Sequence, residues 1–583
     1  MRRSAGVPMF LALSLVLILT ACGGASATPT TAAAPPASAP AVAAATAVPD
    51  ATAPTPTPQI VRSTTVAVFG TPVTAASPDK PVPGGTITAS HASNPSGPDP
   101  WRGGSITLTF ATANIYSGMT RFKPLDRGAI VGELAERWEI SEDGKGYTFF
   151  LRKGVQFHDG TPMTAADVKA SYEREKVIGG HRSSVFKTTL VDVDIIDDHT
   201  VRFNLVRSFG ALMEYMSLQG QGVGKKAIAD EYPTTGYKDY ALNIGTGPFK
   251  FKAYSATSGF QTVKNPNYFH AGQPYLDAFN YIAIRDDSTR FAAYRAGRID
   301  MIPYSAVPPS QAVQAKKDLP DHQVLQAGDG AVYYWNIVFP LNKAPWSDFR
   351  VRKAVHLALD RKAAIEVIEL GYATHSDFLP AALGGRTLAE LATTPGYRYP
   401  KAADVAEAKR LLAEAGYPDG FKMKAFHRPV TMYQNASIFY GEMLKSIGLT
   451  YELDTPPDGA TWTTRSRAFA YDFYHSRGLI RIHDPVGMFG GWISEFNPRM
   501  VDAGIVDSTL DSAITEQLGE LDPTKRRQLN RKVEDLMMGE GRLYTIITNW
   551  GGYWGIIQPR VKNFRFGFSV YDYFAQSETW VVK

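Results

Sequence analysis

The chain has 583 residues, of which 44% are hydrophobic, 11% aromatic and 20% charged. This length exceeds the roughly 100–200 residues of one domain, and the apolar content excludes wholesale disorder and fibrous repeats. The net charge of +5 is small and spread along the chain, so we expect no nucleic-acid partner. The single cysteine excludes an intrachain disulfide, a Cys-rich zinc site and an iron–sulfur cluster.

Residues 1–21 have the pattern of a secretion signal. Arg2 and Arg3 precede an uncharged run, FLALSLVLIL, that is too short to span a bilayer. The run ends in Leu-Thr-Ala before Cys22, a pattern that resembles the lipobox of bacterial lipoproteins. The resemblance implies cleavage before Cys22 and its acylation, which would hold the protein on a membrane outside the cytoplasm, in the periplasm or on the outer cell surface. The alternative is an ordinary secretory signal that happens to contain a cysteine.

Residues 22–80 are rich in Ala, Pro, Thr and Ser and carry no charge before Asp50. A segment with so few large apolar groups cannot offset the entropy of ordering. We expect it to be an unfolded tether that lifts the folded part off the membrane.

From Gly84 onward the sequence alternates strand and helix patterns. Residues 85–89, 147–151 and 200–205 are β-favouring or exchange polar and apolar residues at every second position. Thr164 and Asp167 form a capping box that predicts a helix start. Residues 402–415 repeat Ala and Leu at helical spacing and stop at Gly416. These patterns predict a mixed α/β class.

Five blocks of the chain resemble the family 5 extracytoplasmic solute-binding proteins, the oligopeptide/dipeptide/nickel-binding group of ABC importers. The blocks occur in the family's order at residues 134–174 (LAERWEISEDGKGYTFFLRKGVQFHDGTPMTAADVKASYER), 245–279, 290–301, 335–365 and 408–420. The resemblance implies the two-lobe periplasmic-binding-protein fold of type II, with the extra inserted subdomain of the peptide-binding group and a ligand cleft between the lobes. By the alignment of blocks, lobe I would comprise 84–130, 246–334 and 556–583, the subdomain 131–245, and lobe II 335–555.

The same resemblance implies a function in transport. A protein of this kind captures a solute by lobe closure and presents it to ABC transporter permease subunits, without doing chemistry itself. We therefore expect a monomer that uses no cofactor, with a small-molecule or peptide solute as its ligand.

Ligand choice is expected where the chain departs from this family. Peptide-binding members carry a tryptophan and then an acidic residue four positions before a proline, and that acid pairs with the peptide's ammonium group. Here Arg481 stands four before Pro485, and Gly478 occupies the usual tryptophan position. A cation cannot hold an ammonium group, so Arg481 and Arg477 are candidate anchors for a carboxylate or phosphate. The alternatives are that Arg481 pairs with Asp484 and that Arg477 lies on the surface.

Aromatic and histidine side chains complete the candidate site. Aromatic rings suit a cleft that stacks on sugar or flat ligand faces, although core packing is the more common use of a single ring. His475 and His483 admit a metal-chelate ligand, but their spacing is not that of a metal site, so we expect no resident metal. The predicted ligand-binding residues are Tyr333, Trp335, Trp462, His475, Arg477, Arg481 and Trp550.

No enzyme motif accompanies this set. The sequence has no His-Glu-x-x-His, Gly-x-Ser-x-Gly or Walker motif. We expect a binding protein whose ligand is anionic or sugar-like. The alternatives are an oligopeptide or dipeptide-binding protein of the same importer class, a nickel-chelate binder, a cell-surface hydrolase and a structural surface lipoprotein.

Overall fold

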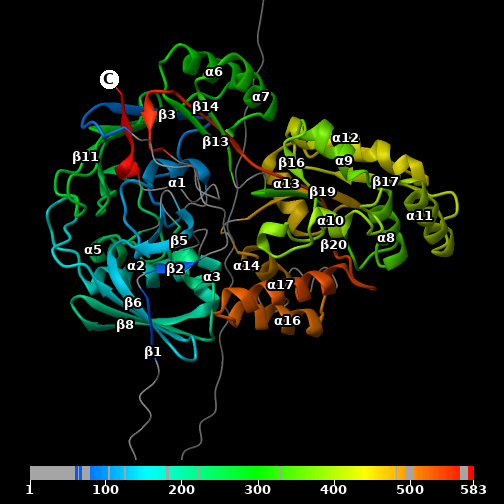
Figure 1. Cartoon of the computed structure of the whole chain (residues 1–583), viewed down its shortest axis with the longest axis horizontal. Coiled ribbons are helices and arrows are strands. Elements are labelled where there is room, and N and C mark those ends of the chain that lie inside the picture. The colour runs from blue at the N-terminus through cyan, green and yellow to red at the C-terminus, as the bar shows by residue number, and fades with distance from the viewer. Residues whose placement is uncertain are drawn as a thin grey trace, which may run out of the picture. The chain divides into compact units, whose positions relative to one another are not determined.

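Three large sheets organise the chain (Figure 1). The structure is a computed structural model, and it describes residues 60–63, 65–67, 79–102, 105–123, 126–178, 183–218, 222–327, 331–480, 482, 484–493, 505–564 and 576–582. Every helix within these ranges is too short or too polar to span a bilayer. The mixed α/β class predicted from the sequence is confirmed.

The seven-stranded sheet is the centre of what we call the first lobe. Its strands lie in the order β10 (Phe249–Ser255), β11 (Gly259–Lys264), β12 (Ala278–Ala283), β3 (Thr86–His91), β13 (Met301–Val307), β21 (Trp554–Ile557) and β14 (Gln323–Gln326). Strand β3 pairs in parallel with β12 on one side and β13 on the other, and α6 (Asp287–Arg295) lies in the crossover that connects β12 to β13. Helix α7 (Pro309–Asp318) follows β13. The sheet therefore joins segments that are far apart in the sequence.

The five-stranded sheet is antiparallel and is the centre of what we call the inserted subdomain. Its order is β1 (Ile60–Ser63), β6 (Ala135–Ser141), β7 (Gly146–Leu151), β9 (Thr200–Leu205) and β8 (Leu190–Asp197). Beside it, β2 (Thr65–Ala67), β5 (Asp126–Gly132) and β4 (Thr120–Lys123) form a small sheet. The helices of this part of the chain are α1 (Ile106–Thr112), α2 (Ala165–Ile178), α3 (Ser183–Thr189), α4 (Leu212–Met216) and α5 (Lys226–Glu231). The predicted start of α2 is confirmed, because the Asp167 carboxylate accepts from the Thr164 amide at 2.9 Å.

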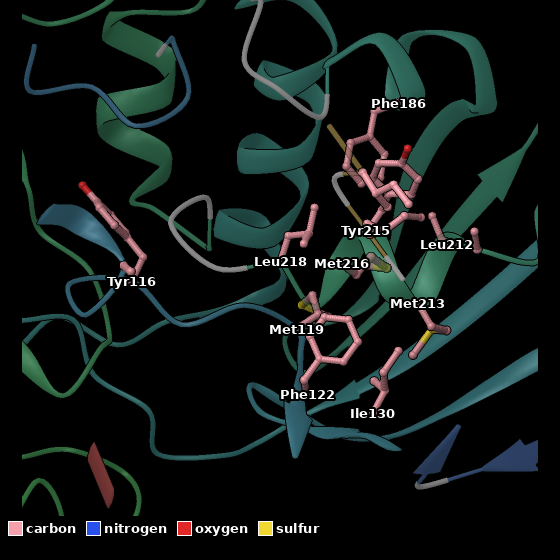
Figure 2. Packing of buried hydrophobic residues seen from close by; sticks show 14 of the residues in the cluster. Tyr116, Met119, Phe122, Ile130, Phe186, Leu212, Met213, Tyr215, Met216 and Leu218 are labelled. Carbon is pink, nitrogen blue, oxygen red and sulfur yellow. The ribbon is translucent and has the colours of Figure 1, made fainter. Parts of the chain in front are cut away.

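Large apolar side chains from β4, the residue before it, β5 and α4 share one core. Met119, Phe122, Ile130, Met213 and Met216 are all buried there, as Figure 2 shows. At about 25 cal/mol per Å² of apolar surface, burial of this kind is the main stabilising term for the subdomain.

The expectation of an unfolded segment over 22–80 is wrong for its last part. Ile60–Ser63 pairs with β6, Ile60 opposite Ser141, and Thr65–Ala67 pairs with β5. The local sequence, IVRSTTVA, is rich in β-branched residues, which favour a pleated strand over the extended Pro-rich chain before it. The two segments add edge strands to sheets whose other strands come from much later in the chain.

The six-stranded sheet is the centre of what we call the second lobe. Its order is β16 (Ala373–Thr374), β20 (Thr545–Gly551), β15 (Tyr333–Val338), β19 (Phe473–Leu479), β17 (Phe421–Phe426) and β18 (Leu449–Asp454). The helices of this region are α8 (Phe349–Ala358), α9 (Arg361–Ile368), α10 (Leu388–Leu391), α11 (Ala402–Glu414), α12 (Thr431–Leu444), α13 (Gly459–Arg467), α14 (Val486–Phe489), α16 (Ser508–Gly519) and α17 (Pro523–Met538). Helix α11 confirms the prediction for 402–415, and Gly416 follows it with φ +91°. A last pair, β22 (Val561–Lys562) and β23 (Trp580–Val581), ends the described chain.

Helices α16 and α17 connect this second lobe to the inserted subdomain. Glu534 of α17 accepts from the Phe378 and Leu379 amides at 3.2 and 2.9 Å, which fixes the helix on the second lobe. The turn between α16 and α17 meets the loop after β9: the Gly210 amide donates to the Leu518 carbonyl at 2.8 Å, and the Ser208 hydroxyl donates to the Gly519 carbonyl at 2.6 Å.

A buried ion pair lies behind this contact. Arg526 of α17 pairs with Asp484, and both side chains are at most 5% exposed. Arg526 also donates to the Gly210 carbonyl at 3.3 Å. Burial, with the charge of Asp484 nearby, raises the pKa of Glu214 on α4 well above its usual range. The three groups couple α4 of the subdomain to α17 of the second lobe.

We predict that Arg526→Met is strongly destabilising, by about 3–5 kcal/mol, because it leaves the Asp484 carboxylate buried without its counter-charge. The urea midpoint of the full chain measures the effect. The matched control is Arg410→Met, which removes an arginine from an exposed helical cluster with Glu407 and Glu414 and should leave the midpoint unchanged. Equal midpoints for the two variants would contradict the prediction.

Candidate ligand site

The candidate residues gather at one end of the six-stranded sheet, where the chain crosses between the lobes. Strand β15 begins at Tyr333, directly after the segment that leaves β14, and β20 ends at Gly551 before the chain enters β21. Strand β15 lies between β19 and β20, with Trp335 opposite Arg477 and Tyr334 opposite Gly478 and Trp550. Because opposite residues share a face and neighbours alternate, the sheet divides the candidates into two sets.

The first set faces α9 and α12 and begins with two aromatic donors. The Tyr333 hydroxyl donates to Glu369 at 2.7 Å, and the Trp335 indole donates to the other oxygen of that carboxylate at 2.8 Å. Both rings are at most 2% exposed, and Trp335 belongs to the second lobe's own core. Burial, then the Glu369 charge, raises the pKa of Tyr333 well above its usual value. These two residues build the wall behind the site rather than its surface.

His475 is the third member of this set and is fully buried. Its ring stacks on Trp335 with centroids 5.1 Å apart and meets the edge of Tyr440 at 4.5 Å. Neither ring nitrogen has a hydrogen-bond partner among the described residues. Burial, assisted by the charge of His427, lowers the pKa of His475 to about 3. The side chain is a neutral core aromatic at ordinary pH, and within the described ranges no cluster of His, Cys, Asp and Glu could hold a metal.

Arg477 is the member of this set that reaches the partly exposed edge. Its guanidinium carbon lies 3.8 Å from the centroid of Tyr333 and 4.9 Å from that of Tyr553, and one nitrogen lies 3.4 Å from the Met432 sulfur. Among the described residues no carboxylate forms an ion pair with it. A guanidinium packed against two phenol rings is oriented by them, and no carboxylate of the described residues neutralises its charge.

The second set lies on the opposite face. Trp550 is fully buried, and its ring packs against Tyr334 at 5.0 Å. A Cβ added at Gly478 would lie 2.2 Å from the Tyr334 ring, so that ring occupies the space which a larger residue at 478 would need. A glycine inside a strand often marks such a close approach. That signal was present in the sequence, yet Tyr334 was not predicted as part of the site.

The remaining predicted residues belong to neither of these two sets. Trp462 on α13 packs with Phe426, Tyr471 and Tyr474 in a separate cluster, under the guanidinium of Arg428 at 5.3 Å. Arg481 and Cys22, which the sequence also singled out, lie outside the described residues, as does His483. The Asp484 carboxylate, offered as an alternative partner for Arg481, pairs with Arg526.

The structure thus brings Tyr333, Trp335, His475 and Arg477 onto one face and places Trp550 on the other. Sequence reasoning missed Glu369, the common acceptor of Tyr333 and Trp335, because nothing in the sequence links the end of α9 to β15. It also missed Arg428, which follows β17. Only the pairing of β17 with β19 brings this residue to the same end of the sheet as Arg477.

We predict that His475→Phe makes the free energy of unfolding less sensitive to a fall in pH. The unfolded imidazole takes a proton below about pH 6.5 and the folded one only near pH 3, so the stability of the native protein is full above pH 6.5 and falls as the pH drops toward 3. Between about pH 7 and pH 5 the native protein should lose on the order of 2 kcal/mol more than the variant. Urea midpoints at the two pH values check this, and parallel losses in both proteins would contradict it.

Comparison with known proteins gives one family. The model of the bacterial extracellular solute-binding proteins, family 5 Middle, matches residues 129–498. Heme-binding protein A of Haemophilus influenzae is 32% identical over 349 residues, which cover 56% of this chain and 60% of the relative, so the chain spans less than two thirds of that relative's length.

Solved structures share the fold. The PBP AgaA from A. tumefaciens R10, in complex with agropinic acid, is 25% identical with a TM-score of 0.69, over 86% of this chain and 99% of that one. The periplasmic binding protein DppA from Helicobacter pylori, in complex with the peptide STSA, is 22% identical with a TM-score of 0.69, over 86% of this chain and 99% of that one. These neighbours have the two-lobe type II fold predicted from the sequence. The chain belongs to the bacterial extracellular solute-binding proteins of family 5.

Proposed function

We propose that this protein captures a solute between its two lobes and delivers it to the permease subunits of an ABC importer. The family and the two-lobe fold support this proposal. The chain crosses between the lobes next to the first residue of β15 and the last residue of β20, so closure about that point would enclose whatever lies on the partly exposed face. We assign it no catalytic step. The lobe boundaries predicted from the sequence, and a monomeric state, are parts of this proposal.

The ligand that fits this site best carries a negative charge on a flat or sugar-like body. One observation carries the choice: Arg477 stacks on two rings and has no carboxylate partner among the described residues. A cation oriented in this way matches a carboxylate or phosphate of the solute. Tyr553, half-buried beside it, offers a ring face to the rest of the ligand. Arg481 is proposed as a second anchor on its sequence position alone.

A peptide bound mainly through its backbone is the second candidate. A structural neighbour with the same fold holds a peptide. Here the ammonium group of such a peptide would need an anchor other than Arg477 or Arg481, since a cation repels it.

We predict that Arg477→Gln loses retained ligand. Native mass spectrometry of the full chain, purified without refolding, should show an added mass in the unaltered protein that is absent or weakened at least about 10-fold in the variant, because a charged hydrogen bond contributes about 1.5–3 kcal/mol. The control is Arg467→Gln, an exposed arginine on α13 of the same lobe. A spread of peptide masses unaffected by Arg477→Gln would contradict the anionic ligand and favour the peptide.

We also predict that Cys22→Ser releases the protein from the membrane fraction. Acylation at Cys22 would attach more than one acyl chain, which is enough for stable anchoring in a membrane. Fractionation of cells and detergent-phase partitioning measure the change. Equal membrane recovery of both forms would contradict the lipid anchor and leave the solute-binding proposal unaffected.

A further inference from the structure

Two arginines, not one, reach the first turn of α12. Strand β17 pairs in parallel with β19, with Phe426 opposite Tyr474. Arg428 lies two residues beyond Phe426, and Arg477 lies three residues beyond Tyr474. Parallel neighbours leave a sheet at the same edge, so the pairing carries both cations to one place.

Contacts with α12 show this convergence. Arg477 touches the sulfur of Met432 at 3.4 Å, and the guanidinium of Arg428 lies 5.9 Å from the ring centroid of Tyr433, the next residue. Arg428 also lies 5.3 Å from the ring of Trp462. The Tyr553 hydroxyl, in turn, lies in the electrostatic field of both arginines. The rings of Tyr433 and Trp462 therefore lie beside Arg428, and the ring of Tyr553 lies beside Arg477.

Neighbouring acids do not neutralise the pair within the described residues. The two oxygens of Glu369 accept from Tyr333 and Trp335. Asp454 pairs with Arg465 at 2.5 Å. Neither Arg428 nor Arg477 forms an ion pair in the described part of the chain. Two like charges near the same helix turn repel each other, and an anion bound between them would relieve that repulsion.

The N-terminus of α12 carries a partial positive charge, of the same sign as the two arginines. This helix of 14 residues follows Val430, whose side chain cannot cap it. The first amides of a helix carry a partial positive charge and are satisfied by an acceptor. The uncapped turn adds donors of the right kind but is a secondary support, since the two arginines define the place.

We propose that Arg428 and Arg477 together bind a doubly charged group of the solute, two carboxylates or one phosphate, at the first turn of α12. The rings of Tyr433, Trp462 and Tyr553 line the flat or apolar body that carries this group. The inference rests on the proposed function and narrows its ligand class from an anion to a compact dianion. It also makes Arg428, which the sequence did not single out, a specificity-determining residue.

Small aromatic acids test the charge count without knowledge of the natural solute. Phthalate and benzoate share one ring and differ by one carboxylate, and benzamide carries none. The melting temperature of the full chain is measured in a concentration series of each, at constant ionic strength. For the unaltered protein, phthalate should bind at least about 10-fold more tightly than benzoate, and benzamide should give no comparable shift.

The variants separate the two cations. Arg428→Gln should reduce the affinity for phthalate to that for benzoate, and Arg477→Gln should weaken both acids. Arg467→Gln is the control and should keep the difference between the two acids. The proposal is overturned if phthalate binds no better than benzoate to the unaltered protein, or if Arg428→Gln preserves the difference.

Retention of the natural ligand distinguishes failure of the dianion site from failure of the proposed solute-binding function. If Arg428→Gln keeps the retained mass of the unaltered protein while Arg477→Gln loses it, the dianion site is wrong and the anionic solute stands. If both variants lose it in step with the phthalate result, the same site holds the natural solute.

Discussion

The buried carboxylate of Glu369 is the constraint on which the site depends. A charge removed from water must be satisfied by donors, and here a phenol and an indole supply them. Each oxygen of Glu369 accepts from one of these neutral donors, and Arg477 stacks on the same tyrosine without an ion pair to Glu369. The acid thus fixes two rings of β15 from behind, and those rings fix the guanidinium in front. Among the described residues, Arg477 therefore forms no ion pair with a carboxylate.

Strand pairing extends this local arrangement across the sheet. Strand β15 lies between β19 and β20, so the residue opposite Trp335 is the cation on one side and Asn549 on the other. The same alternation places Tyr334 and Trp550 on the far face, where Gly478 gives the tyrosine its space. A tryptophan at 478, as expected in peptide-binding members, would need the volume that this ring fills. Gly478 and Tyr334 are therefore best regarded as one structural unit.

The inserted subdomain and the second lobe also contact each other away from the segments that connect β14 to β15 and β20 to β21. Backbone and hydroxyl contacts link the loop after β9 to the turn between α16 and α17, and the buried pair of Asp484 and Arg526 lies behind them. Protonated Glu214 costs less to bury beside Asp484 than a second carboxylate would. The contact between the inserted subdomain and the second lobe therefore depends on the protonation of Glu214 as well as on the shape of the two surfaces.

The sequence by itself determined the family, the α/β class and the individual elements with strong local patterns, such as β7, β9 and α11, because period-two alternation, helical spacing and a terminal glycine are local properties. It also singled out Arg477 from a departure in one motif. Only the tertiary structure decided that Ile60–Ser63 is a strand, that Trp335 and His475 are core residues, and that Arg428 and Arg477 both contact the first turn of α12. Each of these depends on partners tens to hundreds of positions away, and burial and charge pairing are set by those partners rather than by residue type.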